Sequence, residues 1–536
     1  MRNLLKIPKL LSLMLLFLSA TFIACDNEED DMQPDEMDDT VELSGESKVY
    51  NLNALNESGV SGTATLEETE EGSTLLTLEL SGTPAGGEHP AHIHFNSAAI
   101  GGGIAISLEP VDGDTGLSET LIEVDDDGAP ITFTELLDFD GYINIHLSAD
   151  ELETVVAQGD IGSNELTGES KTYNLGERAV EGILGTITFE ERINGFALAT
   201  ISLDGTPEEG EHPAHIHENS AAIGGGIIYS FNLINGSTGI SMTDTRDDGD
   251  GNTFTYSEIL EVDGYVNVHL SADDLGTIVA QGDIGVNELT GESKTYDLGE
   301  RAVEGISGTI TFEERINGFA LATISLDGTP EGGEHPAHIH ENSAAIGGGI
   351  IYSFNPINGS TGISMTDTRD DGDGNTFTYS EVLEVDGYVN VHLSADDLGT
   401  IVAQGDIGVN ELTGESITYP LAERAVEGIS GSITFEERVN GFALATISLD
   451  GTPDGGEHPA HIHENSASEG GGIIYTFNSV NGTTGISMTD TRDDGDGNTF
   501  TYSEVLEVNG YVNVHLSADD LGTIVAQGDI GANFTE

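Results

Sequence analysis

The chain has 536 residues with 71 Gly, 14 Pro, one Cys and no Trp, and its 15 Lys and Arg face 96 Asp and Glu, a formal net charge of -81. This length exceeds what one hydrophobic core usually serves, so we expect several domains. Such a polyanion repels nucleic-acid phosphates and anionic lipid head groups, which excludes both as general partners and favours divalent cations or cationic surfaces. Solubility in a salty exterior is the alternative explanation of the charge.

Residues 1–24 predict a lipoprotein signal peptide. A basic start precedes an apolar run, Leu10 to Ile23, that is too short to span a bilayer comfortably. The run ends in Phe22-Ile23-Ala24-Cys25, which resembles a bacterial lipobox, and Cys25 is the one cysteine of the chain. We therefore predict lipid attachment at Cys25 and membrane contact through that anchor alone. An ordinary secretory peptide is the alternative.

Residues 25–43 predict a flexible acidic tether. Asp and Glu dominate this stretch, and a segment of such low hydrophobicity cannot bury enough surface to fold. The run also resembles the acidic export signal of some Gram-negative surface lipoproteins. We therefore expect an outer-membrane lipoprotein that is exposed at the cell surface.

The rest of the chain repeats with a constant step of 123 residues. The motif His-Pro-Ala-His-Ile-His begins at His89, His212, His335 and His458. A unit of this length is a whole domain with its own core. We predict repeat 1 (44–163), repeat 2 (164–286), repeat 3 (287–409) and repeat 4 (410–536), joined by short junctions as a stiff string.

Within repeat 2, short alternating runs predict an antiparallel β fold. We expect a hairpin with both residues of Asn194-Gly195 at positive φ, and strands near His215, Tyr229, 254–262 and 265–270. In repeat 1, 152–157 is the one stretch for which we expect a helical turn. Seven or eight strands in such a unit predict an all-β sandwich or barrel, four times over.

All 16 histidines fall in two motifs, four in each repeat. Residues two apart in a strand share a face, so His215 and His217 point the same way while Ile216 enters the core. In the second motif His269 lies on the outward face of the strand with Asn267, whereas Val268 lies on the inward face. Three neutral imidazoles suit zinc or copper, with a fourth position left open.

We therefore predict one copper or zinc ion in each repeat, with the alternative that the histidines merely form hydrogen bonds across a polar face. The predicted ligands are His92, His94 and His146; His215, His217 and His269; His338, His340 and His392; His461, His463 and His515. The remaining histidines, His89, His212, His335 and His458, are expected to support a ligand or to cover the site.

Two family resemblances follow from these motifs. The His-Ile-His stretch with its glycine run, and Tyr-Val-Asn-Val-His with Ala-Gln-Gly-Asp-Ile after it, resemble the chordin-type (CHRD) domain over nearly all of each repeat. The spacing of His212, His215 and His217, with Val268-His269 and Ala-Asp-Asp-Leu-Gly, is similar to copper/zinc superoxide dismutase. That resemblance implies a dismutase-like or immunoglobulin-like β fold with His215, His217 and His269 as copper ligands.

Two other motifs match known binding sites only in part. The acidic loop Asp244 to Asn252 could wrap calcium but fails the EF-hand spacing, and an acidic turn without an ion is the alternative. The Gly224-Gly225-Gly226 run predicts a flexible turn.

The leading functional hypothesis is a non-enzymatic surface protein that binds an extracellular ligand or protein, or acts in adhesion. The alternatives are a degenerate copper dismutase-like enzyme, which lacks a recognisable active-site arginine and whose negative field repels superoxide, and a passive spacer or metal store.

Overall fold

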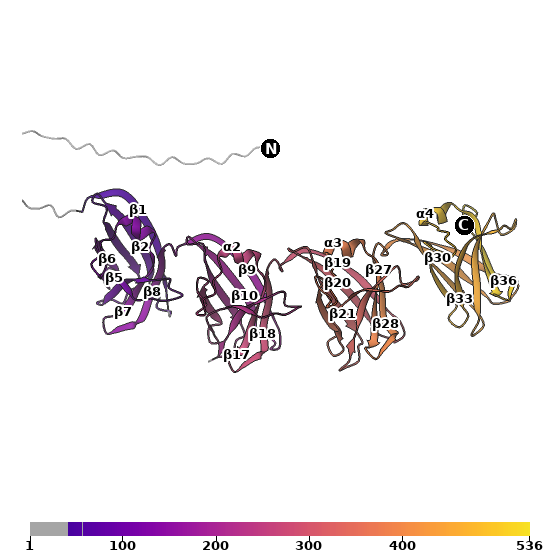
Figure 1. Cartoon of the computed structure of the whole chain (residues 1–536), viewed down its shortest axis with the longest axis horizontal. Helices are drawn as coiled ribbons and strands as arrows, with labels where there is room; N and C mark the ends of the chain where they lie inside the picture. The colour runs from indigo at the N-terminus through magenta and orange to yellow at the C-terminus, as the bar shows by residue number, and fades with distance from the viewer. Residues whose placement is uncertain (1–40, 56, 209, 536) are drawn as a thin grey trace, which may run out of the picture.

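The computed structural model describes residues 41–536 except 56, 209 and 536. The predicted signal peptide, Cys25 and nearly all of the acidic tether lie outside the described residues. Four antiparallel β domains follow one another in a row, with a short helix in each (Figure 1). The all-β prediction with four tandem domains is confirmed. Among the described residues, no helix has the length and apolar character needed to cross a membrane.

Repeats 1 and 2 have closely matching elements. Repeat 1 contains β1 (Leu43–Ala54), β2 (Ser61–Thr69), β3 (Thr74–Ser81), β4 (Glu88–Phe95), β5 (Ile104–Asp112), β6 (Leu117–Ile122), α1 (Phe133–Leu137), β7 (Asp140–Ser148) and β8 (Glu151–Gly162). Repeat 2 contains β9 (Leu166–Glu177), β10 (Leu184–Arg192), β11 (Ala197–Asp204), β12 (Glu211–His212), β13 (Ala214–Glu218), β14 (Ile227–Ser230), β15 (Ile234–Asn235), β16 (Ile240–Asp244), α2 (Tyr256–Glu261), β17 (Asp263–Ser271) and β18 (Asp274–Gly285).

Repeats 3 and 4 continue the same order. Repeat 3 contains β19 (Leu289–Glu300), β20 (Ser307–Arg315), β21 (Ala320–Asp327), β22 (Glu334–His335), β23 (Ala337–Glu341), β24 (Ile350–Ser353), β25 (Ile357–Asn358), β26 (Ile363–Asp367), α3 (Tyr379–Glu384), β27 (Asp386–Ser394) and β28 (Asp397–Gly408). Repeat 4 contains β29 (Leu412–Glu423), β30 (Ser430–Arg438), β31 (Ala443–Asp450), β32 (Glu457–Glu464), β33 (Ile473–Asn481), β34 (Ile486–Asp490), α4 (Tyr502–Glu507), β35 (Asn509–Ser517) and β36 (Asp520–Gly531).

Each domain is a barrel or near-barrel of antiparallel strands. In repeat 4 the strands close in the order β29-β30-β31-β34-β33-β32-β35-β36. Repeat 1 has the equivalent order as an open sheet, from β5 through β8 and β1 to β6. The two histidine-bearing strands are neighbours in every domain, because β4 pairs with β7, β13 with β17, β23 with β27 and β32 with β35.

The barrel interiors are apolar, as the alternation of the strands requires. In β10, Ile187 and Phe189 are fully buried, whereas Thr186 and Thr188 lie half-buried on the other face. In β13 and β17, Ile216, Val266 and Val268 are fully buried in the same core. The interior set leaves the histidines of these strands on the outer side of the barrel wall.

Two sequence-based expectations for repeat 2 were wrong. Within 254–262, residues 256–261 form α2 rather than a strand, because Thr255 and Glu258 make a reciprocal capping box that satisfies the exposed amides of the first turn. In the hairpin turn Gly195 has φ of 82°, whereas Asn194 is not among the positive-φ residues. The loop therefore has three residues, 193–195, and one left-handed position.

The helical turn expected at 152–157 in repeat 1 was also wrong. This stretch lies in β8, which pairs with β7 from Gly162 to Glu151. Pairing with a neighbouring strand outweighs the local preference of Leu152 and the residues after it.

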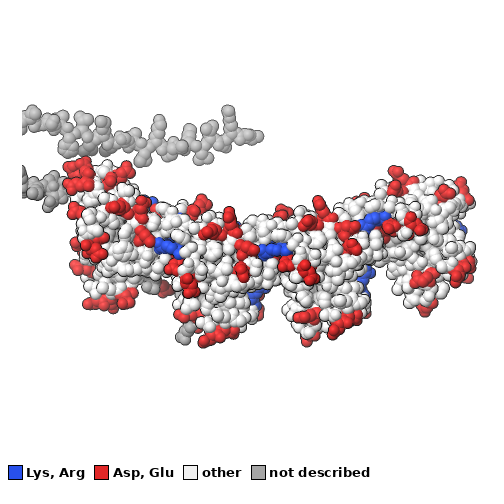
Figure 2. Space-filling model, in the orientation of Figure 1, with Lys and Arg blue, Asp and Glu red and all other residues white. Residues whose placement is uncertain are grey.

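Successive domains are joined by three residues, 163–165, 286–288 and 409–411. Basic side chains gather where one domain meets the next, and acidic side chains are scattered over the rest of the visible face (Figure 2). Near these junctions Lys48 pairs with Glu165 at 2.6 Å, and Lys171 pairs with Glu288 at 2.6 Å. The few cations of a strongly acidic chain are thus concentrated at the contacts between domains.

Candidate metal centre

The candidate site of repeat 2 lies on the paired strands β13 and β17. In this ladder His215 is opposite Asn267, and His217 is opposite Tyr265. The register shifts after Ile216 in the pairing with β14, and around His269 in the pairing with β18. Such β-bulges re-aim a side chain, and here they occur beside two of the three predicted ligands.

The three imidazoles of the site converge. Ring centroids are 5.0 Å apart for His215 and His269, 5.9 Å for His215 and His217, and 6.1 Å for His217 and His269. One ligand atom from each ring lies within 4.8 Å of the others. The same convergence occurs in His92, His94 and His146; in His338, His340 and His392; and in His461, His463 and His515. The structure thus brings together each predicted set of three histidines.

Backbone carbonyls fix the orientation of two rings. Nδ1 of His217 lies 3.0 Å from the carbonyl oxygen of Gly225, and Nδ1 of His269 lies 2.7 Å from that of Leu275. A carbonyl can only accept, so each Nδ1 carries the proton and each Nε2 is left as a lone-pair donor. This arrangement presents both Nε2 atoms in the form that a metal ion requires.

The nitrogen atoms that remain are buried and unpaired. Nδ1 of His215 and Nε2 of both His217 and His269 have no hydrogen-bond partner among the described residues. The corresponding atoms are unpaired in the other three repeats, at His92, His94 and His146; His338, His340 and His392; and His461, His463 and His515. Buried polar atoms are ordinarily satisfied, so a cluster of three facing unpaired nitrogens in every repeat indicates a ligand-binding site.

Burial disfavours the charged form of two of the three imidazoles in repeat 2. It lowers the pKa of His215 to about 4, and the nearby His269 and His217 add to this effect. Burial likewise lowers the pKa of His269, against the opposing effect of the hydrogen bond to the Leu275 backbone. Burial also lowers the pKa of His338 and His461 to about 4, and it lowers the pKa of His92. Neutral imidazoles are the form that binds metal.

His212 occupies a different position from the three converging residues. It is 1% exposed, and its Nδ1 lies 3.3 Å from the backbone carbonyl oxygen of His269. His89, His335 and His458 make the same contact with the carbonyls of His146, His392 and His515. These histidines therefore contact the backbone of the strand that carries a ligand, and they lie buried within the domain.

Sequence reasoning missed the groups that hold the rings. The Gly224-Gly225-Gly226 run predicts a flexible turn, yet the Gly225 carbonyl accepts a hydrogen bond from Nδ1 of His217. Tyr265 was placed in a strand without a role, yet its ring stacks on His217 with centroids 5.1 Å apart. The spacing of these residues to the histidines was visible in the sequence, but their contacts depend on strand register.

The ring geometry fits copper or zinc. Zinc binds imidazole nitrogen at about 2.0–2.1 Å, which places the nitrogens of a tetrahedral site about 3.4 Å apart. The ligand atoms here lie within 4.8 Å of one another, so small ring movements close the set around an ion. Three nitrogen ligands also match the donor preference of copper, and a fourth position remains open for water or another ligand.

The acidic loops have a different arrangement. Oδ1 of Asp248 accepts from the backbone amides of Asp250 and Asn252, and its Oδ2 accepts from the side chain of Asn252. In the described part of the chain, the sets of three or more converging His, Cys, Asp or Glu ligands are the four histidine triads. The loop thus has internal hydrogen bonds of an acidic turn.

Comparison with known proteins gives one local similarity. No family model matches the chain. The cell surface superoxide dismutase [Cu-Zn] 4 of Candida albicans is 44% identical over 64 residues, which cover 10% of this chain and 26% of that protein. The chain is thus distantly similar to a copper/zinc superoxide dismutase over a short stretch, and it spans about a quarter of that relative's length.

Proposed function

We propose that the protein binds four copper or zinc ions, one on the three imidazoles of each repeat. The observation that carries the proposal is the set of three buried, unpaired nitrogens facing one another in all four domains. In repeat 2, His215 would supply Nδ1, and His217 and His269 would supply Nε2. The bound ion would satisfy three polar atoms that otherwise remain desolvated without a partner.

We further propose that these metal sites are presented at the cell surface of the source organism. The basic start, the apolar run and Cys25 support export and lipid attachment. The name of the Candida relative, a cell surface enzyme, agrees with an exterior location. Four metal-bearing domains in a row suit a role in binding an extracellular partner or in adhesion.

Superoxide dismutation is the second candidate function. The short similarity to a copper/zinc superoxide dismutase favours it. The net charge of -81 argues against it, because a strongly negative field slows the approach of the superoxide anion. Each triad also consists of three histidines without a further histidine, cysteine or carboxylate among the described residues.

Metal analysis of the purified full chain tests the proposal. After loading with Cu²⁺ or Zn²⁺ and removal of free ion, we expect about four ions per chain, since four equivalent triads are present. His215→Ala should lower this content to about three. Glu218→Phe is the matched control, because Phe95 occupies the equivalent position in repeat 1, and it should retain all four.

The possible outcomes separate the candidate functions. Metal content unaffected by His215→Ala would refute coordination by the triad. Bound copper with superoxide turnover that is lost on removing the triads would favour the enzyme. Bound metal without turnover would favour binding or storage.

A further inference from the structure

The orientation of one metal ligand depends on a short loop. In repeat 2 this loop, 219–226, follows β13 and supplies the Gly225 carbonyl that accepts from His217. Asn219 starts it in the left-handed region, with φ of 68°, and its side chain donates to the carbonyl of Gly224. A Cβ on Gly225 would lie 2.1 Å from the carbonyl oxygen of Glu218, so glycine is required there. Movement of this loop therefore changes the hydrogen bond that orients His217.

The loop is tied to the end of its own domain. The backbone amide of Ala221 donates to Oδ1 of Asp283 at 2.8 Å. The side-chain amide of Asn287, in the junction, donates to the carbonyl of Asn219 at 2.9 Å and to Oδ1 of Asp263 at 2.9 Å. Asp263, Asp283 and Asn287 thus connect the loop to the surface that faces repeat 3.

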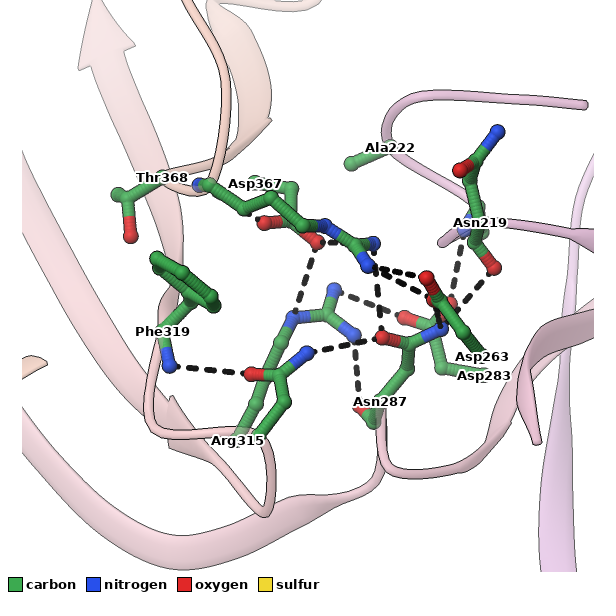
Figure 3. Close-up of polar contacts among 12 residues, drawn as sticks. Asn219, Ala222, Asp263, Asp283, Asn287, Arg315, Phe319, Asp367 and Thr368 are labelled. Atoms are coloured by element: carbon green, nitrogen blue, oxygen red, sulfur yellow. Dashed lines mark hydrogen bonds and ion pairs between the residues drawn. The ribbon is translucent and has the colours of Figure 1, made fainter. Parts of the chain in front are cut away.

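Two arginines of repeat 3 hold these same groups (Figure 3). The side chain of Arg315 is fully buried, and it lies 2.9 Å from Oδ2 of Asp283 while donating to the carbonyl of Asn287 at 2.6 Å. Arg369 donates to both carboxylate oxygens of Asp263 at 2.7 Å. Each guanidinium also lies near Asp367 of its own domain, at 3.7 Å and 3.1 Å.

Repeat 3 also touches the loop directly. The side-chain amide of Asn355 reaches the carbonyl of Ala222 at 3.5 Å. At the next junction, Ala345 and Ile346 of the corresponding loop line a crevice with Phe477 and Asp494 of repeat 4. The loop that positions a ligand is thus part of the contact with the following domain.

The same network occurs at the other two junctions. The ion pairs are Arg192 with Asp160 at 2.8 Å, Arg246 with Asp140 at 2.7 Å, Arg438 with Asp406 at 2.8 Å, and Arg492 with Asp386 at 2.5 Å. The loop amides of Ala98 and Ala344 donate to Asp160 and Asp406. Three junctions therefore present one arrangement of donors and acceptors.

The sequence assigns these arginines to the junction rather than to the fold of one domain. In repeat 1, which no other repeat precedes in this sequence, Thr69 and Glu123 stand at the positions of Arg192 and Arg246, yet the same barrel strands form. In repeat 4, Asn509 stands at the position of Asp386 and Glu469 at that of Ile346. The first and last repeats of this sequence thus differ from the interior repeats at these junction positions.

We propose that docking of each following repeat braces the loop that orients a histidine ligand of the repeat before it, with the arginine pair as positioning residues. The inference rests on the proposed metal binding. The contact acts through the loop, and each repeat braces the loop of the repeat before it rather than its own. The junction between repeats 2 and 3 braces the site of repeat 2 through 219–226, whereas the loop of repeat 3, 342–349, is braced by repeat 4.

Because repeat 3 braces the site of repeat 2 and not its own, the metal site of repeat 3 serves as the control. One full-length background carries His92→Ala, His338→Ala and His461→Ala, so that the triad of repeat 2 is the one left intact. A second full-length background carries His92→Ala, His215→Ala and His461→Ala, so that the triad of repeat 3 is the one left intact. Arg369→Ala is introduced into both, because this arginine is partly exposed and its loss is tolerated better than loss of a fully buried one. Zn²⁺ affinity is measured by competition with a chelator, and circular dichroism checks folding.

We expect Arg369→Ala to weaken Zn²⁺ binding roughly 10-fold or more in the repeat 2 background, the range typical of groups that orient a ligand. Binding in the repeat 3 background should stay within about two-fold, although the same junction is damaged. Without metal, hydrogen exchange of the amides in 219–226 should accelerate while that in 342–349 stays constant.

Equal weakening at both sites would show general destabilisation and overturn the inference, as would unchanged affinity and exchange at repeat 2. A parent background that binds no Zn²⁺ or Cu²⁺ would instead overturn the proposed function itself, and the inference with it.

Discussion

The imidazole of His217 lies on the phenol ring of Tyr265, with ring planes 23° apart and centroids separated by 5.1 Å. The two residues are directly opposite each other on β13 and β17. The phenol oxygen also accepts a hydrogen bond from the amide of Gly225 at 3.2 Å. One tyrosine therefore contacts both a candidate metal ligand and the loop that orients it.

The first prediction separates these two contacts. Tyr265→Phe keeps the stacked ring but removes the acceptor for Gly225, so we expect a loss of stability of about 0.5–1.5 kcal/mol. Tyr265→Leu also removes the aromatic face and should weaken Zn²⁺ binding at this site about 10-fold. Chelator competition in a chain with the repeat 2 triad alone measures both variants. Equal affinity of Tyr265→Leu and the parent would contradict a role for stacking.

The second prediction concerns acid sensitivity of the metal-free protein. Folded His215 takes up its proton near pH 4, whereas its ordinary pKa is 6.5. Between these values the unfolded chain binds more protons, so stability falls as the pH drops through this range. His338 and His461 act in the same direction.

Thermal unfolding of the apo chain at several pH values between about 4 and 7 tests this effect. Replacement of His215, His338 and His461 by Gln should make the melting temperature less dependent on pH in this range. The variant carries the same carboxylates as the parent, so their titration cancels in the comparison. An unchanged slope would refute the contribution of these imidazoles.

The third prediction concerns stabilisation by metal. An ion that binds the folded chain alone raises stability by about 2.7 kcal/mol per site at a free concentration 100 times the Kd. The melting temperature should therefore rise with Zn²⁺ and return to the apo value with a chelator. Ca²⁺ is the control, because an imidazole triad is a poor match for an ion that prefers oxygen ligands. A larger shift with Ca²⁺ than with Zn²⁺ would direct attention to the acidic loops.

The fourth prediction addresses the buried ion pairs between domains. Arg315→Met leaves the carboxylate of Asp367 buried without one of its partners, and loss of one partner of a buried pair typically costs 3–5 kcal/mol, here shared among several groups, so about 3 kcal/mol is expected. Lys171→Met, which removes a half-exposed pair with Glu288, should cost about 1 kcal/mol or less. Denaturant unfolding of the two variants gives the comparison.

Much of the site could be predicted from local pattern. The two-residue spacing of His215 and His217 around a buried isoleucine placed both rings on one face, and the alternation of Val266, Val268 and His269 placed the third outside the core. Local pattern alone does not specify which strands pair, so the sequence could not establish that β13 and β17 are neighbours. The fixed step of the histidine motif then predicted the same arrangement four times.

The missed features depend on local competition or on long-range contacts. Thr255 and Glu258 form a capping box that was visible in the sequence, yet the apolar run after it was interpreted as a strand. One arginine of each junction pairs with a carboxylate about a hundred residues earlier in the chain, as Arg369 does with Asp263. Comparison of the repeats held a signal, since Thr69 and Glu123 replace these arginines in repeat 1 alone.

The three-residue linkers affect what happens when such a protein gains or loses a repeat. At each junction a buried arginine of one unit pairs with a carboxylate of the unit before it, so an interior unit carries both halves of the interface. Gain or loss of a complete interior unit would therefore alter reach and metal capacity together, while each remaining joint keeps its chemistry. Insertion of a few residues in a linker would do the opposite, preserving every unit and uncoupling neighbours.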